Sequence, residues 1–198
     1  MFDDIRREFF PVELVPGITT RPLESRVEFW NITVPLMQQV FTPFAELGAY
    51  EMPNERWEQL KPLREVFART HREQFIFFNE QNEPVGWSYG EMLDSMTFFM
   101  SNTGVLPAYR RRGIYSAFLK QLLRYLAALG YERVTSKHQT NNAPVIIAKL
   151  KAGFVIVGLD LDERWGAQVE LGYFFHEDRR RGYTRAFALE KDWTLVQT

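Results

Sequence analysis

The sequence predicts one domain of mixed α and β structure (class α/β, in the α+β arrangement). We expect a twisted, mixed but mostly antiparallel sheet of about seven strands flanked by helices. Three observations carry this prediction. The chain has 198 residues, enough for one substantial core. Apolar and aromatic runs separated by polar turns fill residues 74–105, as in an antiparallel meander. A helical pattern at 110–129 then leads to another strand, which must return parallel to the strand before the helix.

The N-terminal part is predicted to contribute one strand and several helices. Residues 1–18 form a leading arm or a short helix, and 18–23 form the first strand. Residues 24–47 have apolar positions at helical spacing. Because Pro35 and Pro43 interrupt that pattern, we expect two short helices there rather than one long helix.

A further helix opens at Pro53, and Pro62 predicts a kink or a new start inside it. The pattern then changes to that of strands, because apolar and aromatic residues are bounded by turn residues. A polar turn at 79–84 separates the first two of these strands. The three expected strands cover residues 74–78, 85–92 and 96–105.

The helix at 110–129 carries an apolar stripe on one face and is followed by Gly130, which suits a left-handed helix end. The stripe consists of Ile114, Phe118, Leu122, Leu126 and Leu129. After it the pattern predicts a strand at 132–139, a helix at 144–152 and strands at 154–161 and 168–176.

We interpret the whole chain, 1–198, as a single domain. It has an arm at 1–18, a core at 19–176 and a tail at 177–198, and whether the tail adds a last strand is left open. The triplet Arg179–Arg180–Arg181 before Gly182 reads as an exposed turn, because no clear amphipathic helix follows it.

The segment 105–115 predicts an anion-binding helix start. Pro107 ends the strand, the triplet Arg110–Arg111–Arg112 follows, and Gly113 precedes the amphipathic helix. The first N–H groups of a helix have no intrahelical partner and lie at the positive end of its dipole, so an anion docks there. A glycine leaves room for the anion, and guanidinium groups match phosphate oxygens. This arrangement favours a phosphate-bearing ligand.

These residues resemble the acyl-CoA-binding motif of the GCN5-related N-acetyltransferase (GNAT) superfamily, Arg/Gln-x-x-Gly-x-Gly/Ala. Arg110 and Gly113 match the motif, and Tyr115 stands where a small residue is usual. A later stretch agrees in order and spacing, because Asn142 and the pair Gly153–Phe154 match. Lys149 stands where the family usually has a tyrosine. The resemblance covers roughly residues 75 to 175.

The resemblance implies acetyl-CoA as the acyl donor and a splay between the fourth and fifth strands that receives its pantetheine arm. The acyl group, acetyl in the first place, would pass directly to a primary amine of a small molecule or peptide. Backbone groups at 103–105 would bond the pantetheine, and residues 110–116 the pyrophosphate. Asn142 is a helix N-cap, a cofactor contact or both, and Lys149 is expected at the surface or at the CoA phosphates. The expected cofactor-binding residues are Thr103, Gly104, Val105, Leu106, Arg110, Arg111, Arg112, Gly113, Ile114, Tyr115, Ser116, Asn142 and Lys149.

The catalytic residues do not carry over from the family. The family often places a carboxylate on the strand before the motif, but the matching position is close to Phe99, and its neighbours carry no acid. The usual acid, the tyrosine, is replaced. His138 is the preferred base because the pKa of a histidine suits neutral pH. The remaining candidates are Glu91 or Asp94 as a water-mediated base, and Tyr115 or Tyr173 as the acid.

Aromatic residues on the strands are candidates for the wall of an acceptor pocket. They are Trp87, Tyr89 and Tyr173. Aromatic residues on strands more often belong to the core, so both interpretations stay open.

Composition excludes several classes of protein and site. The net charge is −1 with a pI near 6.3, which argues against nucleic-acid binding. There is no cysteine, which excludes disulfides and thiolate chemistry and is compatible with a reducing cytoplasm. The three histidines have no metal-site spacing, so no metal is expected. The chain shows neither a signal peptide nor an apolar run near 20 residues, so we expect a cytoplasmic protein without membrane contact.

Two other interpretations remain. A non-catalytic acyl-CoA-binding regulatory domain of the same fold is favoured by the missing tyrosine and the missing strand carboxylate. A nucleic-acid module built on the arginine triplets is disfavoured by the net charge. The acceptor amine, the acyl chain length and the oligomeric state, a homodimer included, stay open.

Overall fold

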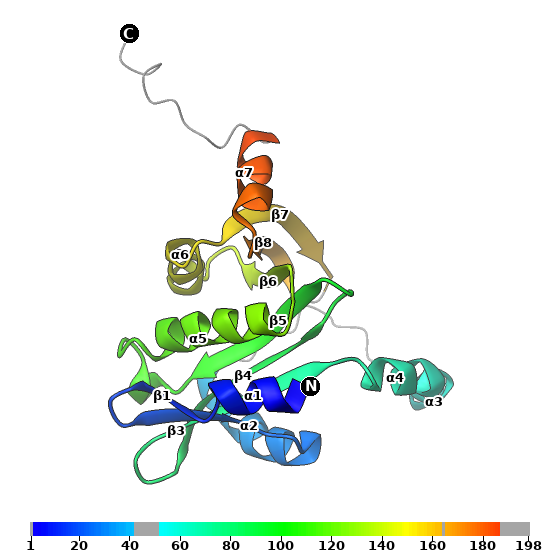
Figure 1. The fold of residues 1–198 in the computed structure, drawn as a ribbon. Helices are drawn as coiled ribbons and strands as arrows, with labels where there is room; N and C mark the ends of the chain where they lie inside the picture. Colours follow the sequence, from blue (N-terminus) through cyan, green and yellow to red (C-terminus); the bar gives the residue numbers. More distant parts are fainter. Residues whose placement is uncertain (1, 42–51, 164, 187–198) are drawn as a thin grey trace.

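The protein is built on one open sheet of eight strands with helices on both faces (Figure 1). The computed structural model describes residues 2–41, 52–163 and 165–186. The strand order is β1-β2-β3-β4-β5-β6-β8-β7, and every neighbouring pair is antiparallel except β5 and β6. The predicted class and the mostly antiparallel sheet are confirmed, with one strand more than expected.

The additional strand lies in the N-terminal segment. Helix α1 (Phe2–Phe9) is followed by a hairpin of β1 (Val12–Val15) and β2 (Ile18–Pro22). Gly17, at φ +77°, makes the tight turn, and its N–H donates to Glu13 Oε1 at 2.9 Å. The segment 1–18 therefore contains both a short helix and a strand, and the four-residue strand is too short to show an alternating pattern in the sequence.

Helix α2 (Arg26–Val40) is one helix, so the predicted break at Pro35 is wrong. The hydroxyl of Ser25 caps its start by accepting from the N–H of Glu28. Phe29 and Leu36 are buried in the core on either side of the proline, and this packing holds the helix together across one lost backbone bond. Pro43 lies outside the described residues.

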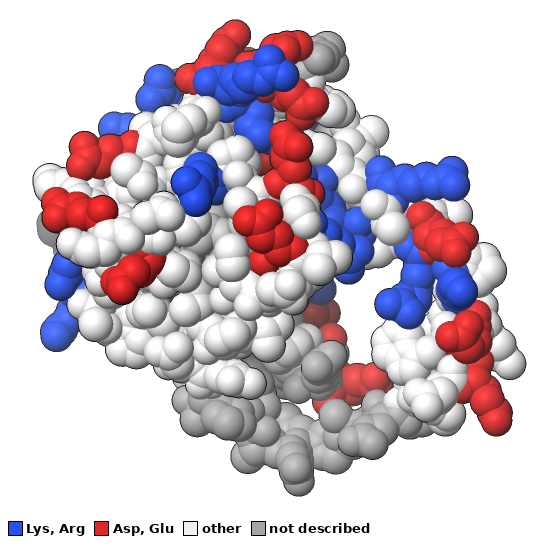
Figure 2. Space-filling model, turned by 90° about the horizontal axis from the view of Figure 1, so that it is seen from below, with Lys and Arg blue, Asp and Glu red and all other residues white. Residues whose placement is uncertain are grey.

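Helices α3 (Asn54–Gln59) and α4 (Lys61–Ala68) stand away from the sheet as a separate lobe (Figure 1). The helical segment is interrupted at Leu60, between α3 and α4, and Pro62 lies in the first turn of α4. The new start predicted there is confirmed. In Figure 2 this lobe lies at the right, and acidic and basic side chains are interspersed over the face in view. That face lacks the one-sign basic stripe typical of nucleic-acid binders among its described residues.

Three strands form the antiparallel centre of the sheet, as predicted. They are β3 (Arg72–Phe78), β4 (Pro84–Met92) and β5 (Thr97–Val105). Side chains of β3 alternate between the two faces: Phe75 and Phe77 belong to the core under α5, and Ile76 and Phe78 to the core under α2. Because both faces are buried, the strand reads as a continuous apolar run.

The second half alternates helices and strands around the parallel pair. Its elements are the short 3₁₀ turn η1 (Pro107–Tyr109), α5 (Ile114–Ala128), β6 (Arg133–Gln139), α6 (Ala143–Lys151), β7 (Val155–Asp162), β8 (Gly166–Phe174) and α7 (Glu177–Ala186). Helix α5 starts four residues later than predicted, because the arginines occupy the turn before it.

Helix α7 corrects two expectations about the C-terminal segment. The predicted tail or last strand begins as a helix, and the triplet Arg179–Arg180–Arg181 lies within it rather than in a turn. Two ion pairs support it, since Arg180 and Arg181 both contact Glu177 from one helical turn away. The described residues include no helix long and apolar enough to cross a bilayer.

A buried carboxylate ties α1 to the sheet. Glu73 Oε1 accepts from Tyr125 Oη at 2.6 Å and from Arg6 Nη2 at 3.2 Å, and His71 Nε2 lies 2.8 Å away. Helix α1, strand β3 and helix α5 thus meet at one oxygen atom. Such a group stabilises only while its partners are present.

We expect Glu73→Ala to lower the free energy of unfolding by about 3–5 kcal/mol, because it leaves the partly buried guanidinium of Arg6 and the buried phenol of Tyr125 without their shared acceptor. Urea denaturation at neutral pH measures this. The control is Glu65→Ala on the exposed surface of α4, which should change it by less than about 0.5 kcal/mol. Equal effects of the two substitutions would contradict the role given to Glu73.

Candidate functional site

The site begins where β5 and β6 part. The two strands pair in parallel only through Thr97–Arg133, Phe98–Val134 and Phe99–Thr135. Beyond these pairs β5 stays bonded to β4, and β6 stays bonded to β8. In the described structure the inner edges of residues 100–105 and 136–139 therefore face a gap with unpaired backbone groups, which are costly unless something bonds to them. We call the point just beyond Phe99 and Thr135 the vertex.

A bulge lies on β5 at the vertex. Tyr89 pairs with Asn102 and Gly90 pairs with Met100, so Ser101 is an extra residue with no partner on β4. Bulges re-aim backbone groups and are frequent beside active sites. Here the bulge changes the direction of the β5 backbone groups at the position where an extended ligand would enter between the strands.

The turn before α5 presents a row of free amides. Within the described part of the chain, the N–H groups of residues 111–116 donate to no protein atom, and no side chain caps the helix. Arg111, at φ +62°, and Gly113, at φ +81°, both have left-handed backbone. Such conformations turn successive N–H groups into a concave anion-binding nest. A Cβ on Gly113 would meet only Val15 Cγ1 at 3.9 Å, so the space beside these amides is open.

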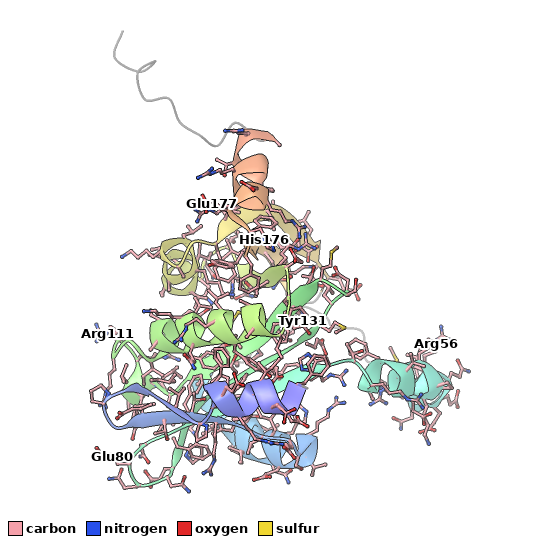
Figure 3. All side chains as sticks on the ribbon, viewed as in Figure 1. Arg56, Glu80, Arg111, Tyr131, His176 and Glu177 are labelled. Carbon is pink, nitrogen blue, oxygen red and sulfur yellow. The ribbon has the colours of Figure 1, made fainter. Side chains whose placement is uncertain are left out.

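The three arginine side chains have different positions. Arg110 folds back, and its Nε donates to the carbonyl of Val105 at 3.2 Å, so it steadies the end of β5. Arg112 lies over the ring of Tyr109 at 4.9 Å. Arg111 is exposed and lies at the turn that leads into α5 (Figure 3). The backbone amides are thus the fixed part of this candidate anion site, and the exposed side chains add charge around them.

Lys149 of α6 lies at the vertex and is fully buried. Its Nζ donates to Ser136 Oγ on β6 at 2.6 Å and to Met100 Sδ on β5 at 3.3 Å. It also lies 4.5 Å from the centre of the Phe154 ring. Burial lowers the pKa of Lys149 from 10.5 to about 7. The expectation of a surface position is therefore wrong, because α6 directs the side chain of Lys149 toward the sheet.

His138 shares the hydroxyl of Ser136 with Lys149. Its Nε2 lies 3.0 Å from Ser136 Oγ. Burial, helped by the charge of Lys149, lowers the pKa of His138 to about 3. The reason for preferring His138 as a base, an ordinary histidine pKa, does not hold here. At neutral pH this imidazole is uncharged and a weak base.

Sequence and structural comparisons agree with this geometry. The profile of the acetyltransferase (GNAT) family matches residues 37–154, more than half of the chain. The chain belongs to the GNAT acetyltransferase family. No curated protein sequence matches it. The match begins before the region in which the sequence motifs are visible and ends at Phe154.

Solved GNAT structures share the fold at low sequence identity. The ribosomal-protein-S5-alanine acetyltransferase of Vibrio fischeri has a TM-score of 0.58 and 11% identity, covering 85% of this chain and 97% of that one. The spermidine/spermine N-acetyltransferase of Vibrio cholerae has a TM-score of 0.57 and 14% identity, with 88% and 99% covered. A phosphinothricin acetyltransferase of Sinorhizobium meliloti, solved with AcCoA, has a TM-score of 0.57 and 18% identity, with 81% and 90% covered.

Glu91 is not a free carboxylate. Its Oε2 accepts from Arg72 Nε at 3.0 Å and from Tyr89 Oη at 2.8 Å, and all three groups are partly buried. A base role for Glu91 would have to compete with this ion pair. Asp94, the other candidate base, accepts from the N–H of Met96 at 2.8 Å in the turn between β4 and β5, a common role for an aspartate in a turn.

Tyr115 is a poor acid in this structure. Burial raises the pKa of its phenol, so the proton is held more firmly than on an exposed tyrosine. The side chain packs against the core under α5. It occupies the motif position of a small residue without blocking the free amides.

The three aromatic residues proposed for an acceptor pocket do not come together. Trp87 is fully buried and donates to Asn102 Oδ1 at 2.7 Å, and Tyr89 packs beside it under α2. Tyr173 packs in the other core, 5.3 Å from Phe154 between ring centres. The sheet therefore separates Tyr173 from the other two.

Other predicted cofactor residues lie around the gap. Thr103 shares a hydrogen bond of 2.8 Å with Ser88, and Gly104 is packed against Trp87. Asn142 occupies the predicted N-cap position of α6 and is exposed, but its side chain makes no capping hydrogen bond. The described residues contain no group of three metal-binding side chains.

Sequence reasoning missed Ser136 and Met100, which accept hydrogen bonds from Lys149. Neither residue type signals a site. They are recognisable only from the strand register, because each is the first residue beyond the last pair of β5 and β6.

The buried lysine predicts a specific pH dependence of stability. Because the pKa of Lys149 is lower in the folded chain, the unfolded chain binds more protons between pH 7 and 10.5, and stability rises with pH in this window. Lys149→Met removes this contribution. We expect the wild type to gain up to about 1.4 kcal/mol per pH unit relative to the variant between these limits.

Denaturant unfolding at pH 6, 8 and 10 measures the difference. Below pH 7 the variant should be the more stable protein, because it buries no charge. Lys151→Met, at an exposed lysine of the same helix, should keep the wild-type slope. A constant gap between wild type and Lys149→Met would disprove the shifted pKa.

Proposed function

We propose that this chain is an N-acetyltransferase that transfers the acetyl group of acetyl-CoA directly to a primary amine of a small molecule or peptide. One observation carries the proposal: the free amides of residues 111–116 lie at the end of a strand that has parted from its neighbour. Few ligands fit both features. A diphosphate fits the amides, and a chain of amides fits the unpaired strand edges.

The two halves of the cofactor would use these features in different ways. The pyrophosphate would accept from the amides of Arg111 to Ser116 at the positive end of α5. The pantetheine arm would run between β5 and β6 as a short pseudo-strand and bond to the backbone at 103–105. Its thioester would then reach the vertex, where the bulge at Ser101 offers a backbone N–H to the acetyl oxygen.

The acceptor amine would enter from the side of α2, the face on which Glu91 and Tyr89 lie. The amine must be unprotonated to attack, and the ion-paired Glu91 can take its proton only through water. The relatives with this fold act, by their descriptions, on spermidine/spermine, on phosphinothricin and on ribosomal-protein alanine. These three classes of amine define the first acceptors to try.

Gly113→Glu tests the anion site. The added carboxylate would lie at the free amides and repel a diphosphate, so acetyl-CoA binding should be lost. Isothermal titration with acetyl-CoA measures this, and circular dichroism checks the fold. The matched control is Gly130→Glu at the other end of α5: it also has left-handed backbone, at φ +92°, and open space for a side chain.

Both variants carry the same new charge and similar backbone strain, so only the position differs. We expect a loss of affinity of at least about 100-fold for Gly113→Glu and wild-type affinity for Gly130→Glu. If Gly113→Glu bound acetyl-CoA as the wild type does, the site would lie elsewhere.

A non-catalytic acyl-CoA-binding domain is the second candidate. The ion-paired Glu91 and the uncharged His138 favour it, because neither is a ready base. Thiol release from acetyl-CoA in the presence of spermidine, phosphinothricin and a peptide with N-terminal alanine separates the two. Saturable binding without thiol release for any acceptor would favour the binding domain.

A further inference from the structure

Lys149 is a buried cation for which the fold supplies no counter-charge. Among the described residues no carboxylate contacts it, and its one oxygen acceptor is the hydroxyl of Ser136. Burying an ammonium with so few partners costs stability. A methionine of similar length would fill the same space without that cost. Packing therefore does not explain a lysine at this position.

The position of Nζ is more informative than its burial. Met100 and Ser136 are the first residues beyond the last pair of the two strands, and Nζ contacts both. The ammonium thus lies across the vertex, at the closed end of the gap between β5 and β6. A ligand that fills this gap as a pseudo-strand ends next to Nζ.

We propose that the ammonium of Lys149 is the general acid that protonates the thiolate leaving the acyl donor, a role that rests on the transferase function proposed above. Ser136 Oγ holds Nζ at 2.6 Å, and the contact with Met100 Sδ at 3.3 Å shows that Nζ already faces a sulfur atom. The thioester sulfur would enter beside it.

The step balances in atoms and charge. The amine nitrogen forms a bond to the acetyl carbon, and the C–S bond breaks with its electron pair going to sulfur. Lys149 Nζ gives a proton to that sulfur and becomes a neutral amine. The new amide nitrogen loses its extra proton to water, and Nζ regains a proton from water when the thiol leaves.

The protonation state suits this work. The pKa of Lys149 is about 7, close to the pH at which the reaction would run, and proton transfer is most efficient there. The titratable group that faces it is His138 on β6, whose pKa of about 3 keeps it uncharged. The other contacts, Met100 on β5 and Phe154 before β7, carry no charge.

The test compares Lys149→Met with the wild type, using thiol release from acetyl-CoA and an acceptor on which the wild type is active. We expect kcat to fall about 100-fold and KM for acetyl-CoA to stay within about twofold, since one acid is lost and the anion site is intact. Lys151→Met, at an exposed lysine on the same helix, should keep the wild-type kcat.

The pH profile separates an acid from a structural lysine. In the wild type kcat should fall as the pH rises through the pKa of Lys149, because the deprotonated amine has no proton to give. Lys149→Met should lose this fall and only rise with pH as the acceptor amine deprotonates. Lys149→Tyr, a phenol with an ordinary pKa near 10, should recover part of kcat with the fall moved to higher pH.

Each outcome is decisive. An active wild type together with an equally active Lys149→Met would overturn the proposal alone and leave the transferase function standing. A slow Lys149→Met that keeps the wild-type pH profile would also overturn it, since the loss would then be structural. A wild type that binds acetyl-CoA but releases no thiol with any of the three acceptors would overturn both proposals.

Discussion

The parting of β5 and β6 is the constraint on which the rest of the molecule depends. Three residue pairs hold the strands together at one end, and different outer partners, β4 and β8, carry them apart. The crossover helix α5 must start where β5 ends, so its free amides come to lie at the open side of the gap. Helix α6 follows β6 in the same way and brings Lys149 back to the closed end. One break in a ladder of hydrogen bonds thus fixes both ends of the candidate site.

The two ends differ in the environment that they offer a charge. At the open end the amides and the exposed Arg111 are in contact with water, so they attract a phosphate without having lost much solvation. At the closed end the cation of Lys149 is out of water and contacts a hydroxyl, a thioether and an aromatic ring. An electrostatic interaction that is weak in water becomes strong at the closed end, because the local dielectric constant is low. In the proposed function, cofactor binding and proton transfer would therefore take place at opposite ends of one gap.

The sequence predicted the local geometry of the turn before α5 better than the surroundings of the catalytic candidates, for a physical reason. Proline, arginine and glycine before an apolar stripe form a local pattern, and local patterns survive folding: the stripe forms helix α5, and Gly113 lies at its N-cap. Lys149 shows the opposite case. Its charge predicts exposure, and only the folded arrangement, in which Nζ contacts both Met100 and Ser136, reveals that it is buried. Pro35 likewise predicts a break that the buried faces of α2 prevent. The burial of a side chain or the continuity of a helix cannot be predicted from one segment alone when it depends on tertiary packing.

Lys149 and His138 are coupled through the hydroxyl of Ser136, and this coupling limits the charge at the vertex. Because burial, helped by the charge of Lys149, lowers the pKa of His138 to about 3, the pair carries at most one positive charge at neutral pH. A thiolate forming at the vertex would add one negative charge beside it. That charge would favour the protonated lysine until the proton moves. Afterwards the sulfur is a neutral thiol, and burial favours the neutral amine. In the proposed reaction the network would thus be favoured as a cation before the C–S bond breaks and as a neutral pair after the thiol has formed, which is the sequence of states that a general acid passes through.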